Sequence, residues 1–455
     1  MAYIGPAPAD SIIATSDIED GAVTSAKIAA SVAIAKGGTG TTTAAAAFTA
    51  LASSQATVGD GSAGAPAITS STASADSGIY FPAADTIGMV SGGTEQFRFG
   101  SNPIPGGSKN SVINGNMLIA QRGDTTAMGS ANGATYGGPD RFCVAVQTSP
   151  QGRGTVTQDS TVLAGSGQSK SYKFDCTTAE SAVAAGEEIA IQYRFEGQDI
   201  QHWMYAQTNA VTLTLSFDFR SPKSGTHCVG FYALDDNEHY LVEFTVASAD
   251  TFEHFDITVA LATSGTDIPS DATEGFRITW PLVCGSTFHG TAGSWANGEK
   301  YCTSNQQNLL DNTANNIYLS GVQLEVGSVA TDFAHEDIGT TLIKCYRYLE
   351  IFGPQSIGAG YTRVMMAYAA TTTAFYGNVY FHPKRAVPTL SKTGTVYANI
   401  ASGMGTTGGT ITADQTGTQS FLMGLTGGSS LTLGQCVSVG LYNDGSSTLI
   451  FSAEL

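Results

Sequence analysis

The densest group of potential metal ligands in the sequence is the run Asp235-Asp-Asn-Glu-His239. Asp235, Asp236 and Glu238 place oxygen atoms close together, and Ca²⁺ binds roughly six to eight oxygens. The run nevertheless lacks the D-x-D-x-D-G spacing of a calcium-binding loop. A polar hairpin turn between two aromatic-rich segments accounts for the same residues. The sequence therefore favours a turn, with a structural Ca²⁺ site at these three residues as the alternative.

A second polar group, Glu253, His254 and Asp256, has the residue types of an acid–base site. These residues lie in an alternating segment whose polar positions are expected to face water. A glycosidase needs two carboxylates held at a set separation, and no pattern in the sequence marks such a pair. The Asp-rich repeats of a β-helical depolymerase are missing as well. We therefore expect no catalytic residues in this chain.

Exposed aromatic rings can stack against sugar rings, so aromatic residues in polar or glycine-rich segments are candidates for glycan contact. Trp280 lies in an apolar strand and is expected in the core instead. The glycan-contact candidates are Trp203, Tyr205, Trp295, Tyr361, Tyr376 and Tyr380. Aromatic residues on such loops also form contacts between subunits, and that alternative stays open.

The charge of the chain excludes two classes of partner. A formal net charge of −18 is unsuited to nucleic acid or an anionic membrane, because both require a basic surface. No run approaches the roughly 18 apolar residues that cross a bilayer, so we expect no membrane insertion. The first residues lack the basic and apolar regions of a signal peptide, so we expect no Sec export.

The seven cysteines are widely spaced, odd in number and contain no C-x-x-C motif. This pattern lacks the spacing of a zinc site and cannot form a complete disulfide framework. We therefore expect buried free thiols in a chain that folds in a reducing cytoplasm, and no cofactor.

Residues 37–78 cannot form a core alone, since 34 of these 42 residues are Ala, Gly, Ser or Thr. Ordering the backbone costs roughly 1–2 kcal/mol per residue, and small side chains recover little of it by burial. The segment is therefore either disordered or ordered by packing against copies of itself. Short strand patterns after it, up to residue 99, favour self-association there.

The rest of the chain has the patterns of a mainly β protein. Alternation of apolar and polar residues predicts half-buried antiparallel strands at 171–175, 188–195, 211–219, 240–246 and 276–280. About eight to ten such strands between 108 and 340 fit a jelly-roll β-sandwich. Seven shorter candidates with dense glycine turns predict a small β domain at 352–455.

Several motifs resemble sequences of bacteriophage tail fibres. Near the start these are Lys36-Gly-Gly-Thr-Gly40 with Phe48-Thr-Ala-Leu51, and Asp76-Ser-Gly-Ile-Tyr-Phe-Pro82 with Gly92-Gly-Thr-Glu-Gln-Phe-Arg98. The middle of the chain resembles a tail-fibre module of carbohydrate-binding jelly-roll type. The motifs that carry this second resemblance lie at 112–116, 139–142, 192–199, 211–217, 320–327, 330–333 and 345–348.

The resemblance implies a homotrimeric fibre of the virion, made in the host cytoplasm and acting at the host surface. Residues 1–35 would dock to the tail or baseplate, and 36–104 would form a linker and an intertwined trimeric shaft. The domains at 108–340 and 352–455 would bind a host-surface glycan without catalysis. The alternatives are a tailspike-like polysaccharide depolymerase and a cellular surface adhesin, which would need an export signal. The sequence leaves open which β domain binds the receptor.

Overall fold

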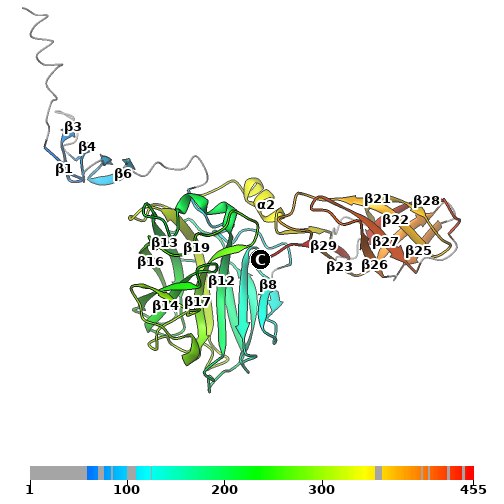
Figure 1. The fold of residues 1–455 in the computed structure, drawn as a ribbon, viewed down its shortest axis with the longest axis horizontal. Coiled ribbons are helices and arrows are strands. Elements are labelled where there is room, and N and C mark those ends of the chain that lie inside the picture. Colours follow the sequence, from blue (N-terminus) through cyan, green and yellow to red (C-terminus); the bar gives the residue numbers. More distant parts are fainter. Residues whose placement is uncertain are drawn as a thin grey trace, which may run out of the picture. The chain divides into compact units, whose positions relative to one another are not determined.

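The computed structural model describes residues 59–69, 76–82, 86–99, 109–123, 125–353, 361–400, 403–407, 410–427, 431–442 and 446–455. The predicted docking segment 1–35 lies outside these residues, as do 36–58 and most of the predicted linker. The chain divides into two compact units, 1–103 and 104–455, and each is described by itself (Figure 1). Within the described residues, no helix is long and apolar enough to cross a membrane.

The first unit is built from very short antiparallel strands. A two-stranded hairpin contains β1 (Gly61–Ser62) and β2 (Ala65–Pro66). A four-stranded sheet has the chain order β3 (Ile68–Thr69), β4 (Gly78–Tyr80), β5 (Ile87–Ser91) and β6 (Thr94–Phe99). Tyr80 and Val90 are buried, whereas Ile68, Ile87 and Met89 on these strands are exposed. The predicted short strands are therefore present, and their intertwining with other copies stays a prediction.

The second unit begins with a β-sandwich of two antiparallel sheets. The six-stranded sheet has the order β16 (Phe252–Ala260), β13 (Thr212–Arg220), β19 (Asn316–Val326), β11 (Ser171–Thr178), β10 (Arg153–Asp159) and β7 (Thr125–Ala127). The seven-stranded sheet has the order β18 (Trp295–Asn297), β15 (Glu238–Val246), β14 (Gly225–Ala233), β17 (Glu274–Cys284), β12 (Glu188–Glu196), β9 (Phe142–Gln147) and β8 (Gly133–Tyr136).

The core of the sandwich follows from the alternation of its strands. In β12, Ile189, Ile191 and Tyr193 join the hydrophobic core, while Glu188 and Gln192 lie on the other face of the sheet. Burying one large apolar side chain contributes roughly 1.5–3 kcal/mol, so the interleaved aromatic residues of the two sheets hold the layers together. The mainly β fold and the β-sandwich are thus confirmed.

Short helical segments join the strands. The 3₁₀ turns are η4 (Gly197–Asp199), η5 (Gln201–Trp203) and η6 (Ser286–Phe288). After β19 comes α2 (Ile338–Tyr346), the one α-helix within the described residues. The Asp337 side chain caps it by accepting hydrogen bonds from the amides of Gly339 and Thr340, which satisfies two otherwise unpaired donors of the first turn.

The C-terminal domain contains two further antiparallel sheets around its own core. The larger has the order β25 (Gly403–Thr407), β24 (Val396–Ile400), β28 (Cys436–Tyr442), β21 (Tyr361–Ala369), β22 (Ala374–Tyr380), β27 (Ser420–Thr426) and β26 (Ile411–Asp414). The smaller has the order β20 (Leu349–Phe352), β29 (Thr448–Ser452) and β23 (Thr389–Thr393). Phe375, Phe421 and Phe451 lie at the centre of the core.

One expectation about the cysteines is wrong. Cys284 and Cys302 form a disulfide, because the chain after β17 turns back and brings the two residues together. Cys143, Cys176, Cys228 and Cys345 are buried free thiols, as expected, and Cys436 is an exposed one. Sequence spacing could not reveal this pair, since the contact depends on the path of the intervening loop.

Candidate functional site

The larger sheet of the C-terminal domain carries tyrosines on its outer surface. Tyr368 in β21 pairs directly with Tyr376 in β22, and their ring centroids are 6.3 Å apart with planes inclined by 34°. Tyr380 lies four residues further along β22 on the same side, because alternate residues of a strand share a face. Tyr368, Tyr380 and the neighbouring Met366 are 52%, 71% and 61% exposed. We call Met366, Tyr368, Tyr376 and Tyr380 the tyrosine face.

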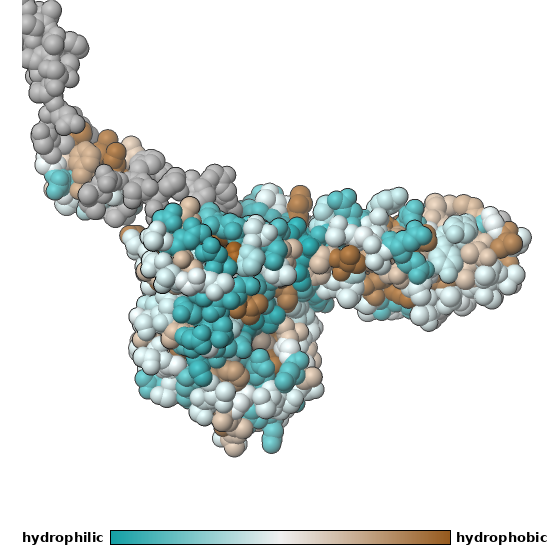
Figure 2. Space-filling view, in the orientation of Figure 1, coloured by the Kyte–Doolittle hydropathy of each residue, from teal (hydrophilic) through white to brown (hydrophobic). Residues whose placement is uncertain are grey.

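The sequence of β22 produces this face by strict alternation. Phe375 and Val379 point into the core, so Tyr376 and Tyr380 must point outward. Gly424 of β27 pairs with Tyr376, and a Cβ atom added at Gly424 would lie only 2.7 Å from the Tyr376 ring. The ring therefore covers the glycine backbone and leaves its outer side available. Figure 2 shows apolar surface on the C-terminal domain within largely pale, weakly polar surroundings.

Two of the predicted aromatic candidates lie in the core of the sandwich. Trp203 has no exposed surface and Tyr205 is 4% exposed. The Trp203 ring packs edge-on against Phe195 and Phe276, with centroids 5.3 Å from each. The expectation that Trp203 and Tyr205 contact a glycan is therefore corrected. The polar neighbours that suggested exposure bond to backbone, as Gln201 does to the carbonyl of Gly197.

The remaining candidates are in different settings. Trp295 in β18 is half-buried, packs against Tyr205 and Tyr240 and donates a 2.9 Å hydrogen bond to the carbonyl of Ala260. Tyr361 opens β21, and its side chain lies outside the described residues. Tyr376 and Tyr380 belong to the tyrosine face, where sequence analysis missed Tyr368 because its partner strand was needed to place it.

The acidic run forms the predicted hairpin turn between β14 and β15. Asp236 accepts hydrogen bonds from the Tyr205 hydroxyl, at 3.1 Å, and from the Thr266 amide, at 2.7 Å. Burial and the neighbouring Asp271 raise the pKa of Asp235. The Asp235 carboxylate therefore lies near Asp271. Within the described residues, Asp235, Asp236 and Glu238 do not converge on a common point.

His254 lies between two carboxylates on the outer face of the six-stranded sheet. Its Nδ1 is 2.7 Å from Asp218 and its Nε2 is 3.2 Å from Asp256. Asp218 comes from β13, whose register places it opposite His254. Glu253 instead accepts hydrogen bonds from the amides of Ala247 and Ser248. Both ring nitrogens of His254 are engaged, so the histidine lacks a free nitrogen for general-base catalysis in this arrangement.

Hydrogen bonding to Asp218 raises the pKa of His254. A raised pKa in the folded state stabilises the fold below about pH 6.5, and this stabilisation is lost as pH rises through the raised value. We expect His254→Gln to lower the free energy of unfolding by less than about 1 kcal/mol at pH 5.5, because half of the side chain is exposed. At pH 8.5 the loss should vanish. Urea unfolding at both pH values measures this loss of stability, with His335→Gln, at an exposed histidine, as the control. An equal loss at pH 5.5 and pH 8.5 would contradict the prediction.

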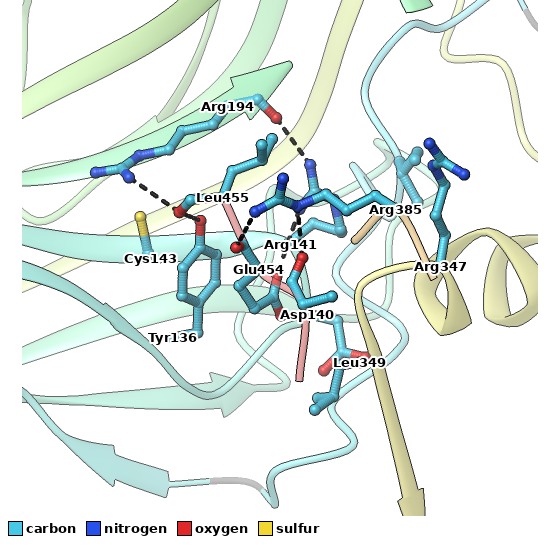
Figure 3. A network of polar contacts seen from close by, with 12 residues as sticks. Tyr136, Asp140, Arg141, Cys143, Arg194, Arg347, Leu349, Arg385, Glu454 and Leu455 are labelled. Atoms are coloured by element: carbon cyan, nitrogen blue, oxygen red, sulfur yellow. Dashed lines mark hydrogen bonds and ion pairs between the residues drawn. The ribbon is translucent and has the colours of Figure 1, made fainter. Parts of the chain in front are cut away.

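A third polar cluster holds residues 453–455 against the sandwich (Figure 3). The Glu454 carboxylate receives Arg122 at 2.9 Å and Arg141 at 3.2 Å. The backbone oxygen of Leu455 accepts hydrogen bonds from the Tyr136 hydroxyl at 2.7 Å and from Arg194 at 3.0 Å. Side chains of the sandwich therefore bind the segment that follows the last strand of the C-terminal domain.

Arg385 completes this cluster from the C-terminal domain. Its guanidinium donates to the carbonyls of Ala453 and Glu454, and also to the carbonyl of Ala272 in the sandwich at 2.8 Å. The guanidinium of Arg141 lies 3.3 Å from the centre of the Tyr348 ring. We call Arg122, Arg141, Arg194, Arg385 and Glu454 the junction cluster. It ties the C-terminal domain to the sandwich next to β29, the last strand of the smaller sheet.

Comparison with known proteins gives only distant similarity. No family model matches the sequence, and no curated protein matches it. One similar structure is the enzymatically active domain of tailspike protein 4 of bacteriophage CBA120, at 10% identity and TM-score 0.25; 48% of this chain and 22% of that chain are covered.

Two other similar structures are binding modules. A family 11 carbohydrate-binding module of a Clostridium thermocellum cellulosomal cellulase has 11% identity and TM-score 0.20, covering 46% of this chain and 94% of that one. A xylan-binding domain from Paenibacillus barcinonensis has 10% identity and TM-score 0.23, covering 46% and 94%. At these TM-scores the similarities identify no family for the chain.

Proposed function

We propose that this chain is a structural, non-catalytic fibre protein that binds a glycan through the tyrosine face. The observation that carries this proposal is the pair Tyr368 and Tyr376, which present neighbouring rings on one sheet surface. Aromatic rings offer flat, apolar surfaces with little conformational entropy to lose. The C–H faces of pyranose rings can stack on such surfaces, while neighbouring polar groups bond to their hydroxyls.

The surroundings of the tyrosine face suit a polysaccharide of low charge. Between Thr393 and Leu433 the sequence contains Asp414 as its single charged residue. Asn378, exposed between Tyr376 and Tyr380 on the same strand, supplies an amide that can donate and accept hydrogen bonds. Selectivity would then come from ring stacking and amide contacts, with little contribution from ion pairs.

The fibre assignment extends the proposal to the whole chain. A homotrimer attached to a phage tail or baseplate through residues 1–35 would present the tyrosine face to a host-surface polysaccharide. The small sheet of the first unit supports assembly, because it exposes Ile68, Ile87 and Met89, and sheets of such short strands need further packing to be stable. Native mass spectrometry of the full chain tests this assembly; a monomer at micromolar concentration would contradict the trimer.

Removing one ring tests the binding surface. We expect Tyr376→Ala to weaken binding of purified host polysaccharide at least about tenfold, which corresponds to about 1.4 kcal/mol, because the central ring is lost. Tyr376→Phe is the matched control: it keeps the ring and should bind within about threefold of the original chain. Isothermal titration calorimetry provides the affinities. Unchanged affinity for Tyr376→Ala would exclude this surface, and release of reducing ends during incubation would favour the depolymerase alternative.

A further inference from the structure

Three potential ligands of a soft metal ion meet where β17 ends. Cys284 is the last residue of β17, and the chain continues through η6 to His289, which forms a parallel β-bridge with Cys302. The ligand atoms of Cys284, His289 and Cys302 all lie within 4.8 Å of one another. Cys302 is buried and the other two are half-buried. No other such group of His, Cys, Asp or Glu occurs within the described residues.

The imidazole of His289 is held in an orientation that leaves one nitrogen for a metal. Its Nε2 lies 3.1 Å from the carbonyl oxygen of Cys284. A carbonyl can only accept, so Nε2 carries the proton and the lone pair is on Nδ1. Histidines that bind metals commonly donate their other N–H to a backbone carbonyl, which fixes the tautomer and the ring orientation. This supporting contact is already in place here.

The two cysteines are spaced in a way that also suits a shared metal ion. Their Cα atoms are 7.0 Å apart, just beyond the usual disulfide span of about 4.4–6.8 Å. Two thiolates on one Zn²⁺, each at about 2.3 Å, hold their sulfurs roughly 3.8 Å apart in tetrahedral geometry. The two cysteines form a disulfide here, and the same Cα separation also suits a pair of thiolates with an ion between them.

We propose that, after reduction of the disulfide, Cys284, His289 and Cys302 bind one Zn²⁺ with water as the fourth ligand. A phosphine reductant takes up an oxygen atom from water and leaves two thiols. Zn²⁺ then displaces the two thiol protons and binds both sulfurs and a ring nitrogen of His289. Either the disulfide or the ion fastens the loop at 285–301 to the end of β17. The same loop is thus held in a reducing and in an oxidising compartment.

Cobalt binding to the full chain tests the proposal directly. The chain is reduced with a phosphine, desalted without oxygen and titrated with Co²⁺, a spectroscopic substitute for Zn²⁺. We expect a thiolate-to-cobalt charge-transfer band that saturates at one equivalent and disappears when one equivalent of Zn²⁺ is added. The oxidised chain should give no band, since its sulfurs are not available. Absence of the band in the reduced chain, or an equal response of the oxidised chain, would overturn the proposal.

Variants identify which residues bind the ion. Cys284→Ser and Cys302→Ser should each abolish the charge-transfer band, and His289→Gln should weaken Zn²⁺ binding by at least about tenfold. Cys436→Ser is the matched control, because it removes the exposed free thiol of the described residues, and should leave the band intact. A band that is lost in Cys436→Ser and kept in Cys284→Ser would overturn the assignment. Circular dichroism checks that each variant is folded, and the comparison of reduced and oxidised chains needs no variant.

Discussion

Replacing Arg141 by alanine is expected to lower the free energy of unfolding of the second unit by about 3–5 kcal/mol, the usual cost of removing one partner from a buried ion pair. Arg141 is 1% exposed and binds the Glu454 carboxylate as well as the carbonyl of Arg194. Without Arg141, the nearly buried Glu454 carboxylate keeps Arg122 as its remaining cationic partner. The Tyr348 ring also loses the guanidinium that packs over it. Urea unfolding followed by tryptophan fluorescence measures the change.

Arg122 provides the matched control for this prediction. It binds the same carboxylate at 2.9 Å, but its side chain is 19% exposed, so water can partly replace it. We expect Arg122→Ala to cost about 1 kcal/mol. Equal losses for the two variants would show that burial does not determine the strength of the junction cluster. A small loss for Arg141→Ala would show that the C-terminal domain is held to the sandwich by other contacts.

The strands were predictable from sequence because their pattern is local. In β13, Leu213, Leu215 and Phe217 alternate with polar residues, and this period of two determines which side chains enter the core. The same holds for β22, where alternation predicts that Tyr376 and Tyr380 share a face. A strand of this kind can be recognised without knowing its neighbours. The mainly β class and most strand positions follow from such segments.

The contacts that build the candidate sites were not predictable, because they join distant parts of the chain. Glu454 meets Arg122 and Arg141 although more than three hundred residues separate them. His254 meets Asp218 only through the register of two strands. Trp203 was misplaced for a different reason. Its polar neighbours in the sequence suggested an exposed side chain, yet its indole is the part of η5 that packs into the core. Local polarity reports the average environment of a segment and not the direction of one side chain.

Glu188 gives the second prediction with a large effect. It lies in β12, has no exposed surface, and neither carboxylate oxygen has a hydrogen-bond partner. Burial raises its pKa from the ordinary value of 4.5 to about 8, against the opposing effect of Arg277. The folded chain therefore holds a proton on Glu188 that the unfolded chain releases above pH 4.5. Because the folded state binds more protons, stability falls as pH rises from about 4.5 to 8.

Glu188→Gln should remove this part of the pH dependence, since an amide does not titrate. At pH 8 we expect the variant to be more stable than the original chain by on the order of 4 kcal/mol, from 1.36 kcal/mol for each pH unit of the window. Near pH 4.5 the two chains should differ little, because a protonated carboxyl and an amide are both neutral. Urea unfolding across this pH range measures both slopes, with Glu253→Gln in β16 as the control. Parallel slopes for Glu188→Gln and the original chain would show that Glu188 is ionised in the fold, and hence that a cation or water reaches its carboxylate.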